Sequence, residues 1–237
     1  GFAASQGSKV IFFFFFTTVT ANWLEPLLEP LDRPEISAVQ PKLLYPDGTI
    51  QCIGIVFSDK SPLGYPIYAG MKPEESWANR SRDFQAVTGA CMAIKADDYA
   101  KVHGFTPRYI NGQEDVDFCL RINLNHRRHC WYSHLSVVFH HESRTPNRSK
   151  FIQHNRAIFI QRWKNKIQAD DCTHYEYDNF LVQSYQADAA NDSISVYIPI
   201  LNRPSQIDLE RPENLESYYF DKIKESGLFN PTWYSKQ

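Results

Sequence analysis

Apolar and polar segments alternate along the chain in a pattern that predicts both strands and helices. Runs of β-prone apolar residues predict strands at 10–19, 36–41, 50–56, 87–94 and 137–141. Apolar residues spaced by three and four predict helices at 22–31, 95–102 and 151–167. The segment 58–83 is polar and rich in Pro, Gly and Ser, which predicts a loop. After 167 the pattern weakens, and we expect a strand at 196–201 and a helix at 215–223.

Local signals mark the ends of several elements. Asn22 is expected to cap the helix that follows it. The tetrapeptide at 46–49, with Asp47 and Gly48 at its centre, is expected to form the turn of a hairpin that leads into 50–56. His103 and Gly104 are expected to stop the helix at 95–102.

The apolar run at 9–21 has phenylalanine at every position from 12 to 16 and admits two interpretations. One is a fully buried strand of a mostly parallel sheet. The other is a secretory signal peptide, with Lys9 as its basic start and 19–21 as its cleavage site. The run is too short to span a bilayer.

The segment 111–121 reads as a turn that opens a helix, with three acids near the first helical turn. The apolar residues that recur at the spacing of a buried face are Val116, Cys119, Leu120 and Leu124. Ionised carboxylates suit the positive end of a helix dipole, so Glu114 and Asp115 have a purely structural interpretation. A carboxylate aimed by a rigid helix is also what a general base requires. The segment alone favours the structural interpretation, because acids are common at helix starts.

The composition is that of a globular protein and gives no support for nucleic-acid binding. Hydrophobic residues make up 43% of the 237 positions, charged residues make up 22%, and the formal net charge is -2. Aromatic residues, at 14%, suit the stacking surfaces of a sugar site and equally a Phe-rich core. The five cysteines include no CxxC pair, so neither a zinc site nor a disulfide framework is indicated, and a reducing, cytosolic setting is the default.

Several short motifs between residues 1 and 167 occur in the order in which a known family carries them. They lie at 23–28, 38–48, 88–92, 104–105, 111–121, 140–143 and 159–163. On these motifs the chain resembles a family 2 glycosyltransferase of the GT-A fold. It is most similar to bacterial rhamnosyltransferase-like members that build cell-surface polysaccharide. The resemblance implies an α/β fold with a Rossmann-like, mixed sheet.

The resemblance also implies roles for single residues. Asp115 would be the catalytic base that takes a proton from an acceptor hydroxyl, and Glu114 would help to hold that acceptor. The reaction would be a single inverting displacement with a nucleoside diphosphate as leaving group. The residues that would bind substrate are Thr88, Gly89, Ala90 and Asp117. His140 would complete the site of a divalent metal, Mn or Mg, which neutralises charge on the diphosphate.

The chain departs from the family in two respects. The family's nucleotide-binding half would precede residue 1, and only 1–4 resembles its last piece. The family's Asp-containing metal motif falls on 14–17, where the residues are Phe14, Phe15, Phe16 and Thr17. Phenylalanine cannot ligate a divalent ion, which prefers oxygen, so no metal carboxylate is assigned. This register favours the strand over the signal peptide, and a shifted reading frame is one explanation of the run.

We therefore expect a partial GT-A domain at 1–148, lacking most of its nucleotide-binding half, and a mainly helical extension at 149–237 that links to further domains. The segment 226–234 resembles one that follows glycosyltransferase modules in large bacterial polysaccharide proteins. The expected activity is transfer of a sugar from a nucleotide-sugar donor to a glycan acceptor. The expected location is the cytoplasm, with peripheral association at the inner face of the membrane left open.

Three alternatives to an active transferase remain. One is a catalytically inactive relative that binds glycans or acts as a scaffold. Another is a truncated fragment of a transferase. The third is a secreted carbohydrate-binding protein, with 9–21 as its signal peptide.

Overall fold

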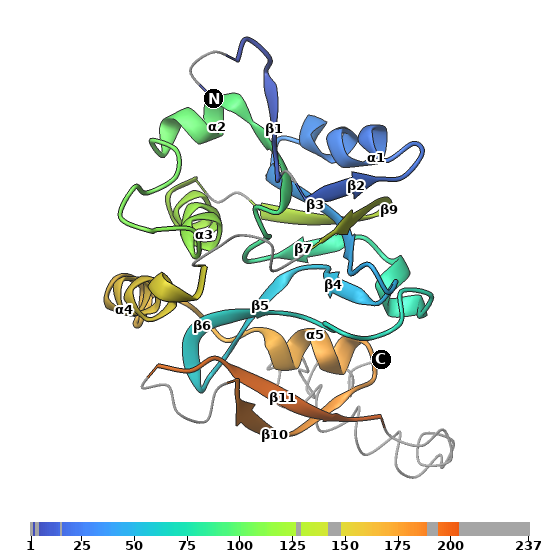
Figure 1. The fold of residues 1–237 in the computed structure, drawn as a ribbon, viewed down its shortest axis with the longest axis vertical. Coiled ribbons are helices and arrows are strands. Elements are labelled where there is room, and N and C mark those ends of the chain that lie inside the picture. The colour runs from blue at the N-terminus through green and yellow to red at the C-terminus, as the bar shows by residue number, and fades with distance from the viewer. Residues whose placement is uncertain are drawn as a thin grey trace, which may run out of the picture.

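A mixed β-sheet is the centre of the fold (Figure 1). The computed structural model describes residues 2, 5–14, 16–126, 129–141, 148–188 and 194–203. The main hydrogen-bonded path runs β1-β8-β3-β9-β2, with β4 added to β3 and β7 added to β9. The strands of this sheet are β1 (Lys9–Phe13), β2 (Thr17–Val19), β3 (Ile36–Leu44), β4 (Ile50–Cys52), β7 (Arg82–Phe84), β8 (Cys91–Lys95) and β9 (His129–His140). Helices flank the sheet, so the predicted α/β class with a mixed sheet is confirmed.

β3 and β9 form the core of this sheet. They run parallel, with Val39 opposite Trp131, whereas β8 is antiparallel to β3. All nine residues of β3 are buried, because β3 lies between β8 and β9 and α1 (Leu24–Leu28) packs against it. The strands expected at 36–41 and 137–141 are therefore parts of longer ones. The predicted strand ended at Pro41, whereas β3 continues past it. A register shift between Pro41 and Lys42 accommodates the proline.

The apolar run at 9–21 forms two strands at opposite ends of the sheet path, which corrects the expectation of one buried strand. β1 pairs antiparallel with β8, and β2 pairs antiparallel with β9. The side chains of Phe13, Phe14 and Phe16 are 44%, 39% and 38% exposed, and Phe15 lies outside the described residues. A continuous apolar run predicts burial on both faces, but the end strands of this sheet are only partly covered.

The predicted turn at 46–49 is present, but the hairpin that it starts is short. Gly48 has a φ of 87°, and the carboxylate of Asp47 accepts the Thr49 N–H at 2.9 Å. After β4 the chain leaves the sheet at Gly54, and β5 (Ile55–Ser58) pairs with β6 (Ser61–Pro66) in a separate two-stranded sheet.

The expectation of a loop at 58–83 is wrong. It contains β6, the 3-10 helix η3 (Ser76–Asn79) and β7. β6 is built from Ser, Pro, Leu, Gly and Tyr, so its β propensity is low. Its strand conformation depends on pairing with β5, which no local pattern shows.

The helices begin and end close to their expected positions, with two corrections. Asn22 has a φ of 58° and lies before Trp23, the residue that caps α1. α2 (Ala96–Lys101) ends as expected before His103, whose φ is 59°. α3 (Glu114–His126) buries Val116, Phe118, Cys119, Leu120 and Ile122, whereas Leu124, expected on the buried face, is 55% exposed.

The C-terminal part that the structure describes contains strands as well as helices, and the mainly helical character expected for 149–237 stays a prediction. It comprises α4 (Ile152–Trp163), α5 (Asp171–Tyr177), β10 (Leu181–Ala187) and β11 (Tyr197–Asn202), preceded by the 3-10 helix η4 (Arg148–Phe151). β11 confirms the strand expected at 196–201 and pairs antiparallel with β10. The helix expected at 215–223 and the motif at 226–234 lie outside the described residues.

Buried carboxylates attach α5 to the β5–β6 sheet. Asp171 accepts the hydroxyl of Tyr65 at 2.8 Å, and Asp178 accepts the hydroxyl of Tyr68 at 2.7 Å. Burial, with help from these carboxylates, raises the pKa of both tyrosines. The boundary expected between 148 and 149 stays a prediction. No helix in the described ranges is long and apolar enough to cross a membrane.

Candidate functional site

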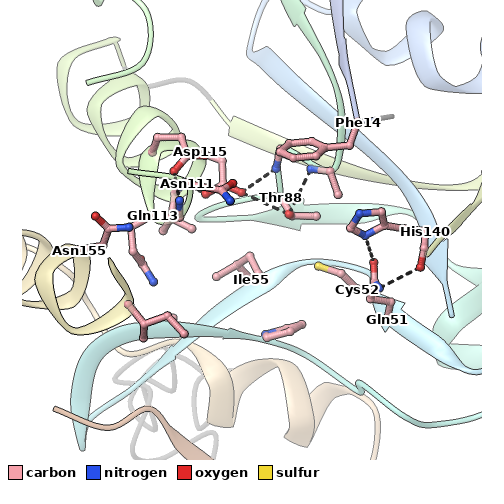
Figure 2. Close-up of a pocket in the computed structure, with 18 of the residues that line it drawn as sticks. Phe14, Gln51, Cys52, Ile55, Thr88, Asn111, Gln113, Asp115, His140 and Asn155 are labelled. Carbon is pink, nitrogen blue, oxygen red and sulfur yellow. Dashed lines mark hydrogen bonds between the residues drawn. The ribbon is translucent and has the colours of Figure 1, made fainter. Parts of the chain in front are cut away.

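A pocket of about 360 Å³ lies between α3, α4 and the β5–β6 sheet (Figure 2). Its lining also includes residues of β4 and β9 and the segments 88–90 and 111–113. The predicted site residues that line it are Thr88, Gly89, Ala90, Glu114, Asp115 and His140. These residues are up to 52 positions apart in sequence, counting from 88 to 140, so the fold brings them together.

The carboxylate of Asp115 is held at the pocket wall by three donors. The Gly89 N–H donates to Oδ2 at 2.7 Å, and the Thr88 hydroxyl donates to the same oxygen at 3.2 Å. The Val116 N–H donates to Oδ1 at 2.8 Å. The main chain at 88 is anchored in turn, because its N–H donates to the side chain of Gln40 on β3 at 3.0 Å. The direction of this carboxylate is therefore set before a ligand arrives.

Glycine at position 89 allows the main chain to approach Asp115 this closely. A Cβ at position 89 would lie 3.1 Å from the Cβ of Asp115 and 3.5 Å from its Oδ2. Carbon atoms normally meet at about 3.5–4.0 Å, so any larger residue would push the carboxylate away. The Gly89 N–H can donate to Asp115 because Gly89 has no side chain.

The turn before α3 has an unusual backbone conformation. Asn111 and Gln113 have φ values of 55° and 73°, and Gly112 between them has a φ of 152°. Each non-glycine residue in the left-handed region costs about 1–2 kcal/mol, so the surrounding contacts must hold this turn. One of them comes from Glu114, whose carboxylate accepts the Gly112 N–H. Backbone strain at a pocket wall is a recurrent feature of functional sites.

Asn155 of α4 is the second support of this turn. Its side-chain amide accepts the N–H of Ile110 at 3.0 Å and donates to the carbonyl of the same residue at 2.9 Å. Asn155 is buried and lines the pocket. No motif in the sequence marks Asn155, and its one signal is that it is a polar residue on the apolar side of a predicted helix.

Asp117 does not line the pocket, although it was predicted to bind substrate. Its buried carboxylate accepts the Thr106 hydroxyl at 2.7 Å and the Arg121 Nε–H at 2.8 Å on one oxygen. The other oxygen accepts the Trp163 Nε1–H at 3.0 Å and the Tyr109 hydroxyl at 3.3 Å. These bonds join α3, α4 and the loop between α2 and α3. In this geometry Asp117 holds these elements in position relative to one another. A role for Asp117 in substrate binding stays a prediction.

The ring of His140, at the end of β9, lines the pocket and is held by Gln51. Nδ1 lies 2.7 Å from Oε1 of Gln51, whose amide nitrogen donates to the main-chain oxygen of His140 at 3.3 Å. Because the amide nitrogen is directed at a carbonyl, the amide oxygen faces the ring, and Nδ1 is the donor. The lone pair of the neutral imidazole is then on Nε2. Glu142 and Ser143, the rest of this motif, lie outside the described residues.

The described residues do not offer a divalent ion a set of ligands. No group of three or more His, Cys, Asp or Glu side chains in that part of the chain is arranged to hold a metal. Phe14 and Phe16 line the pocket, and the ring of Phe14 lies 6.2 Å from that of His140. Mn²⁺ and Mg²⁺ prefer oxygen ligands, which phenylalanine cannot supply, so this wall does not fit such an ion.

Part of the chain is similar in sequence to curated proteins. No protein-family model matches it. It is 29% identical to the O-antigen biosynthesis protein RfbC of Myxococcus xanthus over 148 residues, which are 60% of this chain and 12% of RfbC. It is 27% identical to the uncharacterized protein y4gI of Sinorhizobium fredii (strain NBRC 101917 / NGR234) over 162 residues, 64% of this chain and 18% of y4gI. The chain thus spans less than a fifth of these curated relatives.

The fold of this chain resembles that of a solved structure. The glycosyltransferase GalNAc-T7, crystallised with UDP, GalNAc and Mn²⁺, matches with a TM-score of 0.51 and 16% identity. The match covers 69% of this chain and 33% of GalNAc-T7. At this identity the likeness is one of fold. The chain therefore has the fold of part of a glycosyltransferase.

Proposed function

We propose that this chain is the acceptor-side part of a family 2, rhamnosyltransferase-like glycosyltransferase with a partial GT-A domain. It would transfer a sugar from a nucleotide-sugar donor to a glycan acceptor in cell-surface polysaccharide synthesis. The observation that carries the proposal is the carboxylate of Asp115, fixed at a pocket wall by Gly89 and Thr88. The similarity to RfbC and the fold shared with GalNAc-T7 support the class of enzyme.

In the proposed reaction Asp115 is the base. Its carboxylate accepts the proton of an acceptor hydroxyl as the hydroxyl oxygen attacks the anomeric carbon of the donor sugar. The bond from that carbon to the nucleoside diphosphate breaks, and the configuration inverts. Gly89 and Thr88 keep the carboxylate in place during proton transfer, which is the positioning that such a step needs. Glu114 lies beside Asp115 in the pocket wall and would help to hold the acceptor.

No step of the proposed reaction involves a metal ion. GalNAc-T7 was solved with Mn²⁺, and the resemblance gives His140 the place of a metal ligand. The tautomer that Gln51 imposes, with the lone pair on Nε2, suits that role. Among the described residues, no three His, Cys, Asp or Glu side chains are grouped so that they could hold a metal ion.

We further propose that the module works in the cytoplasm, at the inner face of the membrane. All five cysteines are free thiols, and Cys52, Cys91, Cys119 and Cys130 are buried. Burial raises the pKa of the Cys91 thiol to about 12, which keeps it protonated and unreactive. Unpaired, protected thiols are typical of proteins in a reducing compartment.

A second candidate is a catalytically inactive relative that binds glycans. It is favoured by Phe14 and Phe16, which line the pocket where the family carries metal-binding carboxylates. Such a protein would keep the acceptor half of the site and lack the means to activate a donor.

The test of transfer is Asp115→Asn in the protein that carries this chain. Release of nucleoside diphosphate and extension of the acceptor are measured together, with a panel of nucleotide sugars. The amide keeps the size of the carboxylate but cannot accept a proton, so we expect kcat to fall by about a hundredfold or more. Unfolding should change little, because Asp115 is only half-buried and the amide oxygen can still accept the Gly89 N–H.

The matched control is Asp97→Asn. Asp97 is an exposed acid in the first turn of α2, as Asp115 is an acid in the first turn of α3, and it does not line the pocket. Transfer should be unchanged in this variant. Full turnover by Asp115→Asn would exclude Asp115 as the base, and no turnover by the wild-type protein with any donor would favour the glycan-binding candidate.

A further inference from the structure

Phe14 and Phe16 both line the pocket, and the two residues are called its aromatic wall below. Both rings are more than a third exposed, although phenylalanine is usually buried. Main-chain hydrogen bonds hold both residues in place: the Phe14 N–H donates to Ala90 at 3.1 Å, and the carbonyl of Phe16 accepts the His141 N–H at 2.8 Å. Exposed aromatic rings that line a pocket are typical of a ligand site.

Polar groups line the remainder of the same pocket. Asp115 contributes a carboxylate, and Asn111 and Gln113 contribute amides (Figure 2). An apolar wall combined with hydrogen-bonding groups suits a pyranose ring, which has C–H groups on its faces and hydroxyls around its edge. The pocket volume of about 360 Å³ is in the usual range for a small-molecule site.

The charges in the pocket disfavour a diphosphate. Within the described chain, the charged side chains that line it are the carboxylates of Glu114 and Asp115 and the guanidinium of Arg156. That guanidinium is committed to other partners, because it donates to the carbonyl of Ile194 at 2.8 Å and pairs with Asp188. An anion would therefore meet two carboxylates without a cation to neutralise it.

We propose that this pocket binds a neutral sugar ring against the aromatic wall, without a divalent ion. Phe14 and Phe16 stack on the C–H face of the ring, and the ring hydroxyls bond to the polar groups opposite. The inference deepens the proposed function by naming the moiety that this site takes, the acceptor sugar, and it rests on that function for the ligand being a carbohydrate.

The experiment measures binding of methyl glycosides of glucose, galactose and rhamnose, and of UDP, to the full chain by ligand-observed NMR. Each titration is run in EDTA and again with Mn²⁺. The variants are Phe14→Ala, which removes one ring of the wall, and Phe14→Tyr, which restores it. The control is Phe13→Ala, because Phe13 is also exposed but packs on Trp23 at 5.6 Å and does not line the pocket.

We expect at least one methyl glycoside to bind equally well in EDTA and in Mn²⁺. Phe14→Ala should weaken this binding about threefold to tenfold, the usual size of an aromatic stacking contribution. Phe14→Tyr should restore it, and Phe13→Ala should leave it unchanged.

Three results would overturn the inference. They are equal losses in Phe14→Ala and Phe13→Ala, sugar binding that requires Mn²⁺, and no binding of any glycoside to the folded chain. Failure of the proposed function looks different: glycosides then bind in a Phe14-dependent way, while no donor supports transfer. If transfer depends on Asp115 but the KM for acceptor is unchanged in Phe14→Ala, the inference fails and the function stands.

Discussion

Replacing Asp117 with asparagine tests whether this acid supports the site or binds substrate. Each carboxylate oxygen accepts two hydrogen bonds in the structure, from Thr106 and Arg121 on one side and from Trp163 and Tyr109 on the other. An amide nitrogen cannot accept, so either orientation of the asparagine leaves two buried donors without their acceptor.

The main loss comes from the ion pair with Arg121. The side chains of Asp117 and Arg121 are 0% and 9% exposed, and their atoms are 2.8 Å apart. Removing one partner of a buried pair costs about 3–5 kcal/mol. Arg162 also lies 3.1 Å from Asp117, but it is 38% exposed, so its contribution is small. For a chain of this size the loss corresponds to a fall in Tm of about 6–20 °C.

The assay is urea unfolding followed by circular dichroism, with the exposed Asp97→Asn as the control. We expect Asp117→Asn to lose most of this free energy, or not to fold at all, while Asp97→Asn stays close to the wild type. A change of less than about 1 kcal/mol would refute the reasoning from burial. If stability were kept and sugar binding lost, Asp117 would bind substrate, as the family resemblance implies.

Two further predictions concern the pocket and the sheet. Gly89→Ala should lower kcat for transfer about tenfold or more with little change in Tm, because the new Cβ would displace the carboxylate of Asp115. Unchanged turnover would show that the close approach of the main chain at position 89 to Asp115 is unimportant. Burial, followed by the charge of Lys42, lowers the pKa of His134, which contacts Ser81 at 2.7 Å. The folded state therefore binds fewer protons than the unfolded state below pH 6.5, and unfolding free energy should fall as pH drops through that value. His134→Gln should flatten this dependence in urea titrations across pH, and parallel curves for the two proteins would contradict it.

Features encoded by neighbouring residues could be predicted from the sequence. The turn at Asp47 and Gly48, the stop at His103 and the start of α3 each depend on a few adjacent residues, and each is present. β11 was predicted from its own apolar pattern.

Features that depend on distant partners could not be predicted in this way. β6 has a weak strand propensity and exists through pairing with β5. The run at 9–21 has a strong apolar signal, but its division between the two ends of the sheet path is decided by pairing with β8 and β9. Periodicity reports which face of an element is apolar, and does not report which element covers it.

The candidate site also depends on contacts between residues that are distant in sequence. Placing Thr88 and Gly89 beside Asp115 required the family resemblance, because no spacing rule links positions 26 and 27 residues apart. Gln51 and Asn155 were missed, since their partners lie 89 and 45 residues away in sequence. Side chains that orient a site residue from another element have no local pattern of their own.

The central claim is that Asp115 faces the acceptor sugar in this pocket. The most direct measurement is a crystal structure of the protein with the methyl glycoside that binds most tightly. We expect a sugar hydroxyl within about 2.6–3.2 Å of the Asp115 carboxylate, with the sugar ring against Phe14. A sugar bound elsewhere, or one that turns its hydroxyls away from Asp115, would contradict the account.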